Sequence, residues 1–184
     1  MVHEMNDENL MLAYCDGDAS AFESLYSRHK GGVYRYLKRQ CGNEATAEEL
    51  FQDVWMNIIK ARQRYKASAK FTTWLYHIAH NRLIDHYRKN RRLPASYDDE
   101  LPDEIEDNCH LDPVSEINRG RQADKLLDCI GQLPEAQRES FLLKEESGLS
   151  LLDIADVAGT SRETIKSRLR YALNTLRRCL RGLL

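Results

Sequence analysis

The side chains that could do chemistry gather in two basic segments of this 184-residue chain. Residues 62–92 hold nine Lys and Arg residues against Asp85 alone, and residues 160–184 hold seven against Glu163 alone. Residues 1–24 carry six acids, and residues 94–118 carry nine, with no Lys or Arg in either segment. The net charge of −2 therefore conceals a strong separation of charge along the chain. Two basic blocks joined by an acidic connector predict two surfaces that bind a polyanion.

The first basic segment contains a predicted helix that begins at Thr72 or Thr73 and ends near Asn90. Helical periodicity places five residues on its buried side: Leu75, Tyr76, Ala79, Leu83 and Tyr87. The opposite stripe collects Trp74, His77, Asn81, Asp85 and Arg88, and the basic run 88–92 continues it. An aromatic ring, an amide and a cation on one exposed stripe suit base stacking and phosphate binding. The alternative is that Trp74 packs in the core and the basic run serves only solubility.

A metal-dependent helical hydrolase is a second reading of the same segment, because His77, His80, Asp85 and His86 have spacings that resemble a helical metal site. The helical geometry argues against it. At about 100° per residue, His86 lies about 180° from His77, so one straight helix cannot direct all four side chains to one ion. We therefore expect no metal, no cofactor and no catalysis.

The second basic segment has the pattern of a helix-turn-helix. Ser150 and Asp153 cap a short helix, Gly159 makes a turn, and a capping box at 160–163 begins a long helix. The core face of that long helix is predicted to contain Ile165, Leu169, Ala172, Leu173, Leu176 and Leu180. Its outer face carries Glu163, Ser167, Arg170, Tyr171 and Asn174, flanked by Arg162, Thr164 and Lys166. Such a helix can read base edges in the major groove, although an ordinary amphipathic surface helix remains the simpler alternative.

The rest of the chain is also predicted to be helical, so the fold class is all-α. A capping box at 46–49 begins a helix whose apolar face is Ala47, Leu50, Phe51, Val54, Trp55, Ile58 and Ile59. Helices are also expected over 9–15, over 19–41 with an interruption near Gly31 and Gly32, and from 135 to about 146. Residues 65–73 are predicted to form a loop. No alternating β-branched run predicts a strand.

Two small helical domains, joined by an acidic flexible linker, account for this pattern. Residues 94–118 contain three of the four prolines and few large apolar side chains, and we expect domains at 1–93 and 123–184 with a linker at 94–122. The five cysteines are odd in number, widely spaced and never in a CxxC motif, so we expect reduced thiols. No run of 18 apolar residues is present, and we expect a cytoplasmic protein with no membrane insertion.

Three segments resemble the extracytoplasmic-function (ECF) group of sigma factors in the sigma-70 family. Residues 47–55 (AEELFQDVW) resemble the region 2.2 helix, and residues 71–81 (FTTWLYHIAHN) resemble regions 2.3 and 2.4. Residues 159–169 (GTSRETIKSRL) resemble region 4.2. The resemblance runs from about residue 18 to residue 180, in the family's order and spacing. It implies a non-enzymatic subunit that directs core RNA polymerase to promoters, with region 2 at 1–93 and region 4 at 123–184.

The resemblance also implies site residues and partners. The polymerase would bind the polar face at Glu48, Glu49, Gln52 and Asp53. The melted −10 strand would be bound by Tyr65, Lys66, Lys70, Phe71, Trp74, His77, Asn81 and Arg88. The −35 duplex would be read by Arg162, Thr164, Lys166, Ser167, Arg168, Arg170 and Tyr171, of which Arg170 and Tyr171 occupy positions that vary within the family. A dedicated anti-sigma factor is expected to mask the polymerase-binding surfaces.

A response-regulator-type transcription factor is the main rival, because its recognition helix resembles residues 161–173. Such a protein would need an α/β receiver domain with an acidic phosphorylation pocket. No strand pattern precedes the linker, so the sequence favours the sigma factor.

Overall fold

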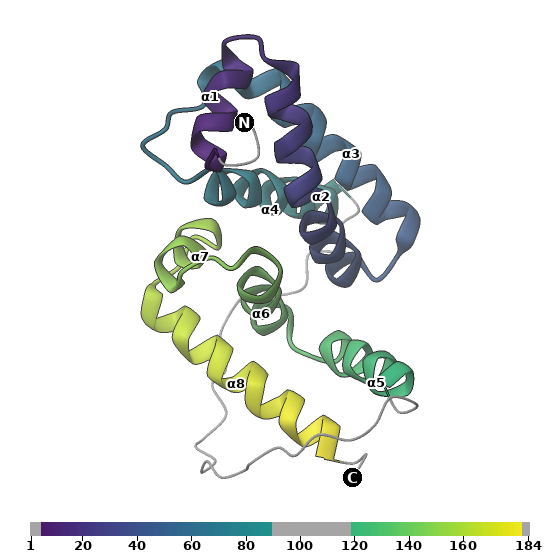
Figure 1. Cartoon of the computed structure of the whole chain (residues 1–184). Helices are drawn as coiled ribbons and strands as arrows, with labels where there is room; N and C mark the ends of the chain where they lie inside the picture. Colours follow the sequence, from purple (N-terminus) through teal and green to yellow (C-terminus); the bar gives the residue numbers. More distant parts are fainter. Residues whose placement is uncertain (1–4, 90–118, 182–184) are drawn as a thin grey trace.

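The structure, a computed structural model, describes residues 5–89 and 119–181, and the regular elements in these ranges are helices (Figure 1). The first half contains α1 (Asp7–Cys15), α2 (Ala19–Cys41), α3 (Glu44–Ala61), the short 3-10 helix η2 (Arg62–Arg64) and α4 (Phe71–Lys89). The second half contains α5 (Arg119–Gly131), α6 (Glu135–Ser147), α7 (Leu151–Val157) and α8 (Arg162–Arg181). The predicted all-α fold in two helical halves is confirmed. The predicted linker at 94–118 lies outside the described residues.

Helix α2 organises the first half, because it packs against α1, α3 and α4. Its side chains Leu25, Val33 and Leu37 are fully buried. The ring of Trp55 on α3 lies edge-on to Tyr26 on α2, with ring centroids 4.8 Å apart. Full burial of each large apolar side chain contributes about 1.5–3 kcal/mol, and this burial holds the bundle together.

Two predicted helix starts and one predicted interruption in the first half are wrong. Helix α3 begins at Glu44, because Asn43 Oδ1 accepts a hydrogen bond from the Thr46 N–H at 3.0 Å. Helix α2 continues through Gly31 and Gly32, so the predicted interruption is absent. Helix α4 begins at Phe71, before the predicted caps Thr72 and Thr73. The Phe71 N–H donates instead to the carboxylate of Glu8 on α1 at 2.9 Å, and a bond from so distant a residue is not visible in the local sequence.

The predicted helix-turn-helix is present in the second half. Ser150 and Asp153 form the predicted capping box of α7, and Gly159 makes the turn with a φ of 62°. The cap of α8 is Ser161, whose Oγ accepts from the Thr164 N–H at 3.1 Å, so the cap lies one residue after the predicted Thr160. Leu173 is 43% exposed, contrary to the predicted core face.

Helix α5 was not predicted from the sequence, because residues up to 122 were expected to belong to the linker. The helix begins at Arg119 and packs against α8 and, more lightly, α2. Its apolar positions are few, and Cys129 and Ile130 carry its buried contacts. Helix α5 therefore begins about one helical turn before the predicted start of the second domain at residue 123.

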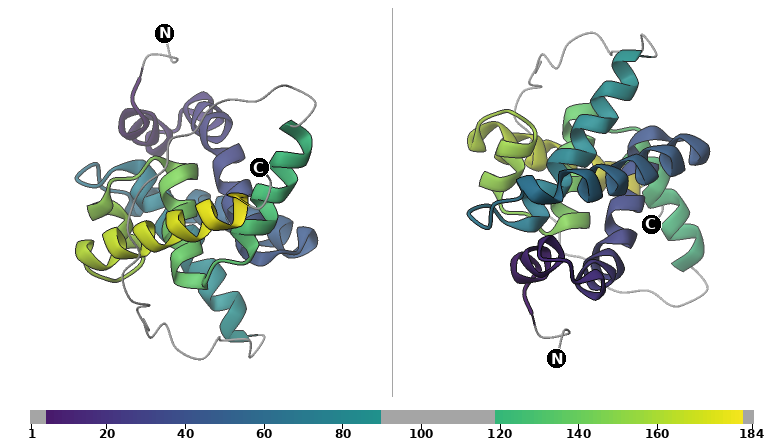
Figure 2. Two further views of the ribbon diagram at one scale, coloured as in Figure 1. Left: turned by 90° about the horizontal axis from the view of Figure 1, so that it is seen from below. Right: turned by 90° about the horizontal axis from the view of Figure 1, so that it is seen from above.

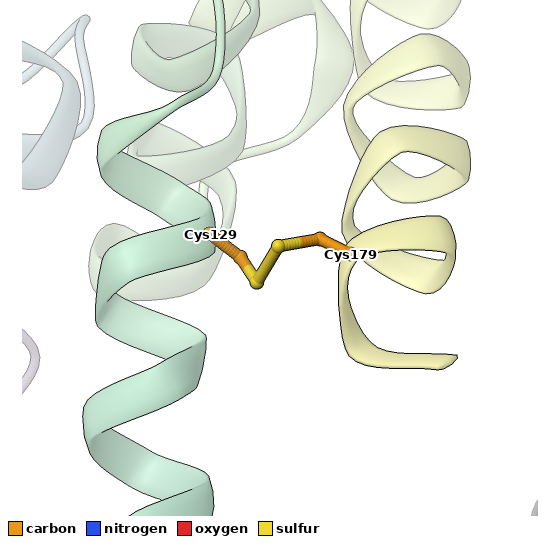
Figure 3. The surroundings of a disulfide bond; sticks show 2 residues. All are labelled: Cys129 and Cys179. Atoms are coloured by element: carbon orange, nitrogen blue, oxygen red, sulfur yellow. A yellow bond between two sulfur atoms is a disulfide. The ribbon is translucent and has the colours of Figure 1, made fainter. Parts of the chain in front are cut away.

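A disulfide joins the first and last helices of the second half (Figure 3). Cys129 on α5 is bonded to Cys179 on α8, so the expectation of reduced thiols is wrong for this pair. Cys15 and Cys41 are free thiols, and Cys109 lies outside the described residues. Burial raises the pKa of the Cys41 thiol to about 11, so this group remains protonated near neutral pH.

The two halves pack against each other. Figures 1 and 2 show α6 and α7 beside α2 and α4, and these helices are in contact in the structure. Within residues 5–89 and 119–181, no helix is both long and apolar enough to cross a membrane.

The disulfide predicts a redox-dependent stability of the second half. Replacing Cys179 with Ser should lower its free energy of unfolding by up to about 4 kcal/mol, because the bond closes a loop between residues 50 positions apart. Denaturant unfolding of oxidised protein measures the change, and wild type treated with a thiol reductant should unfold like the variant. Equal midpoints for oxidised and reduced wild type would show that the bond does not stabilise the domain.

Candidate nucleic-acid interface

Helix α4 presents part of the predicted stripe to solvent. Asn81 and Arg88 are exposed, whereas Trp74 and His77 are half-buried. The Trp74 ring packs against Tyr65 at 5.2 Å and Phe71 at 6.2 Å between centroids. Trp74 is therefore partly packed against other rings and partly accessible, and its assignment to base stacking stays a prediction.

The loop before α4 divides the predicted −10 residues into two kinds. Lys66 and Lys70 are exposed. Phe71 is fully buried and Tyr65 only 7% exposed, so the prediction that these two rings contact DNA is wrong for this arrangement. The Tyr65 hydroxyl donates to the Ala69 carbonyl oxygen at 3.0 Å, and burial raises its pKa to about 12. These two rings shape the loop that carries the lysines.

Helix α8 presents a basic outer face. Arg162, Lys166 and Arg170 are exposed, and Thr164, Ser167 and Tyr171 are half-buried. A groove of about 800 Å³ follows this face, lined by Leu151, Glu163, Lys166, Ser167, Leu169, Arg170, Leu173, Asn174 and Arg177. The guanidinium of Arg170 lies over the Tyr171 ring at 5.1 Å. This stacking orients the cation along the outer side of the helix.

Arg168 was predicted to contact DNA, but it is only 6% exposed and lies on the inner face of α8 with Ile165 and Ala172. Exposed Leu173 and buried Arg168 together show that the core face is rotated from the predicted one. Periodicity placed all the apolar side chains inside, whereas the packing of α6 and α7 on α8 selects which face is covered.

The predicted polymerase face on α3 is exposed to solvent. Glu48, Glu49, Gln52 and Asp53 are exposed, opposite the buried Ala47, Leu50 and Val54. Met56, which the sequence reading missed, is 48% exposed one turn further along the helix. Met56 lies three residues after Asp53, so helical periodicity could have placed it on the same face. Acids beside an exposed methionine make a surface suited to a protein partner.

The histidines of α4 diverge, as the helical geometry predicted. His77 Nε2 lies 2.8 Å from Asp156 on α7, and His80 Nδ1 lies 2.5 Å from Glu139 on α6. Across the described ranges, no group of three His, Cys, Asp or Glu side chains could hold a metal ion. Two residues of the metal-hydrolase hypothesis, His77 and His80, therefore contact carboxylates on two other helices.

Comparison with known proteins identifies the chain's family. The family model of sigma-70 region 2 matches residues 25–93, and that of sigma-70 region 4 matches residues 123–176. The RNA polymerase sigma factor CarQ of Myxococcus xanthus is 31% identical over 170 residues, covering 92% of this chain and 95% of CarQ. The ECF RNA polymerase sigma factor SigK of Mycobacterium sp. (strain KMS) is 28% identical over 179 residues, covering 93% of this chain and 89% of SigK. The chain belongs to the ECF group of the sigma-70 family.

Solved structures share the fold of this sigma factor. CnrH, in complex with the cytosolic domain of CnrY, has a TM-score of 0.69 at 21% identity, covering 96% of this chain and 97% of CnrH. The sigma factor RpoE of Bartonella quintana, in complex with the anti-sigma factor NepR, has a TM-score of 0.66 at 21% identity, covering 87% of this chain and 96% of RpoE. Sigma factors bind core RNA polymerase and initiate transcription at promoters, and they are not enzymes. The response-regulator and hydrolase alternatives are not supported.

The exposed acids of α3 are predicted to bind core RNA polymerase, and charge reversal tests this prediction. Reversing the charge at Glu49 and Asp53 to Lys should weaken binding to core RNA polymerase without loss of helix content, because both side chains point away from the core. Fluorescence titration with core polymerase measures the affinity and circular dichroism the fold. The Glu23→Lys variant, exposed on α2, is the charge-matched control for each single reversal. An affinity equal to that of the control would make the α3 face an ordinary solvated surface.

Proposed function

We propose that this sigma factor reads promoters with two separate faces: the outer face of α8 contacts the −35 duplex, and the exposed part of α4 with its preceding loop captures the melted −10 strand. The observation that carries the proposal is the basic groove along α8, at the second helix of a helix-turn-helix. Residues 1–93 would form the −10 and polymerase-binding domain and 123–184 the −35 domain. The protein would act in the cytoplasm.

The α8 face has the chemistry that duplex reading requires. Lys166 and Arg170 can donate to guanine acceptors or phosphates, and the half-buried Ser167 can adapt to either base edge. Arg162 lies in the first turn, where the backbone N–H groups of a helix end also favour phosphate. We assign base reading to Lys166, Ser167, Arg170 and Tyr171, and phosphate binding to Arg162 and Thr164.

The α4 face suits a separated strand. Exposed Asn81 can bond a base edge, Trp74 offers part of a ring for stacking, and Lys66, Lys70 and Arg88 can hold phosphates. Tyr65 and Phe71 position the loop from beneath, because both rings are buried. We assign capture of a flipped base to Asn81 and the exposed loop, and the stacking at the edge of the bubble to Trp74.

A regulatory partner is also proposed. The similar structures of CnrH and RpoE hold the cytosolic domain of CnrY and the anti-sigma factor NepR, respectively. We infer that an anti-sigma factor binds this sigma factor as well. The exposed α3 face with Met56 is one surface that such a protein could cover in competition with the polymerase.

Dependence on core polymerase tests the proposed function. Purified core polymerase with this protein should produce transcripts from promoters whose 5′ ends appear in cells on overexpression. The protein alone should protect these promoters poorly. Strong, specific protection by the protein alone, with no transcription on adding core polymerase, would contradict the proposal.

The two DNA faces should fail at different steps. Replacing Lys166 or Arg170 with Ala should weaken initial promoter binding by about 1–3 kcal/mol where a base contact is lost. Replacing Asn81 or Trp74 with Ala should spare that binding and slow open-complex formation, because base capture and stacking stabilise the separated strand by about 1–3 kcal/mol per base. Gel-shift and permanganate footprinting of holoenzyme separate the two steps.

A pre-melted promoter refines this test. The bubble should rescue Trp74→Ala more than Asn81→Ala, because it supplies strand separation but not the lost base contact. For the Lys166 and Arg170 variants, the control is Arg178→Ala, which removes a cation of α8 outside the groove lining. Wild-type opening of duplex promoters by both α4 variants would show that α4 does not serve in melting.

A further inference from the structure

Helix α4 begins at a residue that cannot cap it. The Lys70 carbonyl oxygen accepts the first helical bond, from the Trp74 N–H at 3.1 Å, so Lys70 occupies the N-cap position. Its ammonium group has three donors and no acceptor, so it cannot bond the free N–H groups of the first turn. The Thr73 hydroxyl is buried and has no hydrogen-bond partner within the described ranges. The first turn of α4 therefore depends on an acceptor from another element.

That acceptor is Glu8 of α1, which lies 63 positions before its partner in the chain. Its Oε1 accepts from the Phe71 N–H at 2.9 Å. A carboxylate at a helix N-terminus also interacts favourably with the helix dipole. Burial and the nearby charge of Glu8 raise the pKa of Tyr65 to about 12, so the same carboxylate also lies near the loop before α4.

The residue beside Glu8 fixes this end of α1 on α2. Asp7 Oδ1 accepts from Arg28 Nη1 at 2.8 Å, and Asp7 Oδ2 lies 2.6 Å from His29 Nε2. The hydrogen bond with His29 lowers the pKa of Asp7 despite burial, so the carboxylate is ionised near neutral pH. The His29 ring also lies beside Phe71, with ring centroids 5.4 Å apart. The start of α4 is thus held by α1 and α2 together.

The far end of α1 holds the beginning of the same loop. The Cys15 thiol donates to the Arg62 carbonyl oxygen at 3.0 Å, and Gln63 Nε2 donates to the Cys15 carbonyl oxygen at 3.1 Å. Both partners belong to η2, which lies about 10 Å from Glu8 along α1 at ~1.5 Å per residue. Helix α1 therefore holds residues 65–70, here called the capture loop, at both ends. Fixing both ends of a loop reduces the ordering entropy that binding would cost.

From these contacts we propose that α1 is a clamp for the capture loop and that Glu8 is its positioning residue. The carboxylate holds the first turn of α4, so that Lys66, Lys70 and Trp74 are presented together to the melted strand. The inference rests on the proposed function of the −10 face. Glu8 needs no contact with DNA, because it acts through the backbone of Phe71. Without it the first turn frays, and the loop must be ordered when the strand binds.

Glu8→Ala tests the proposal, with Glu23→Ala as its matched control. Both changes remove the same carboxylate from a helix, but only Glu8 bonds the backbone of α4. Hydrogen exchange of the full chain, followed by mass spectrometry, should become about 2- to 30-fold faster over residues 65–74 in Glu8→Ala, the factor that loss of an N-terminal cap corresponds to. Exchange over α3 should be unchanged in both variants. An equal acceleration over α3 would mean that Glu8 stabilises the whole domain, and would overturn the proposal.

Open-complex formation supplies the functional readout. With saturating holoenzyme on a duplex promoter, Glu8→Ala should open about 2- to 30-fold more slowly than Glu23→Ala, with initial binding unchanged. Glu8→Gln keeps an acceptor at the same place without the charge, so its loop exchange and opening rate should lie between those of wild type and Glu8→Ala. If Glu8 acted by repelling DNA phosphates, both Glu8 variants would open promoters faster than wild type, contrary to the proposal.

Circular dichroism shows whether Glu8→Ala is folded. If it is not, wild type and Glu8→Gln are compared in its place, and the Gln variant should show faster loop exchange and slower opening. Unchanged loop exchange in the folded variant would overturn the proposal, because Glu8 would then not hold the loop.

Faster loop exchange with wild-type opening would also overturn the proposal, and the α4 variants show which idea has failed. Slow opening by Trp74→Ala and Asn81→Ala would retain the proposed −10 face and reject only the role of Glu8. Wild-type opening by both would show that the proposed function of α4 is itself wrong.

Discussion

Tyr36 lies where three helices meet, and both halves of the molecule depend on its position. Its fully buried ring on α2 packs edge-on against Tyr76 of α4, with centroids 5.5 Å apart, and its hydroxyl reaches Glu139 of α6. The ring thus fixes the angle between α2 and α4 while its polar end faces the second domain. Because packed interiors leave little free volume, moving α2 would disturb the core of one domain and the docking of the other together.

Much of this arrangement was predictable from local patterns. The apolar stripe at Ala47, Leu50, Val54 and Ile58 identified α3, and the capping box at Ser150 with the turn at Gly159 identified the helix-turn-helix. These features depend on residues within one or two turns of each other, which a sequence displays directly. The exposed faces of α3 and of α8 at Lys166 and Arg170 followed from the same periodicity.

Several of the errors share a different cause, because they depend on residues far away in the chain. Phe71 begins α4 because Glu8 accepts its N–H, and Arg168 turns inward because α6 and α7 select the covered face of α8. Glu139 and Glu146 look like ordinary surface acids until α2 and α4 are placed against them. Tyr65 and Phe71 were placed among the DNA contacts although both rings are buried, since an aromatic near a basic run can face either way. Periodicity along one helix cannot report what a second helix covers.

The bond between Cys129 and Cys179 also determines how the second domain carries a load. It ties α5, which follows the connector between the halves, to α8, which carries the basic groove. Tension arriving along the connector enters at the start of α5 and crosses the bond into the far end of α8. The turns of α5 before Cys129 can still unwind, but the bond shields the segment between Cys129 and Cys179 from the pull. In its oxidised form the domain would keep the end of α5 attached to α8, whereas the reduced domain could lose its whole first helix while the turn and the reading helix stay folded.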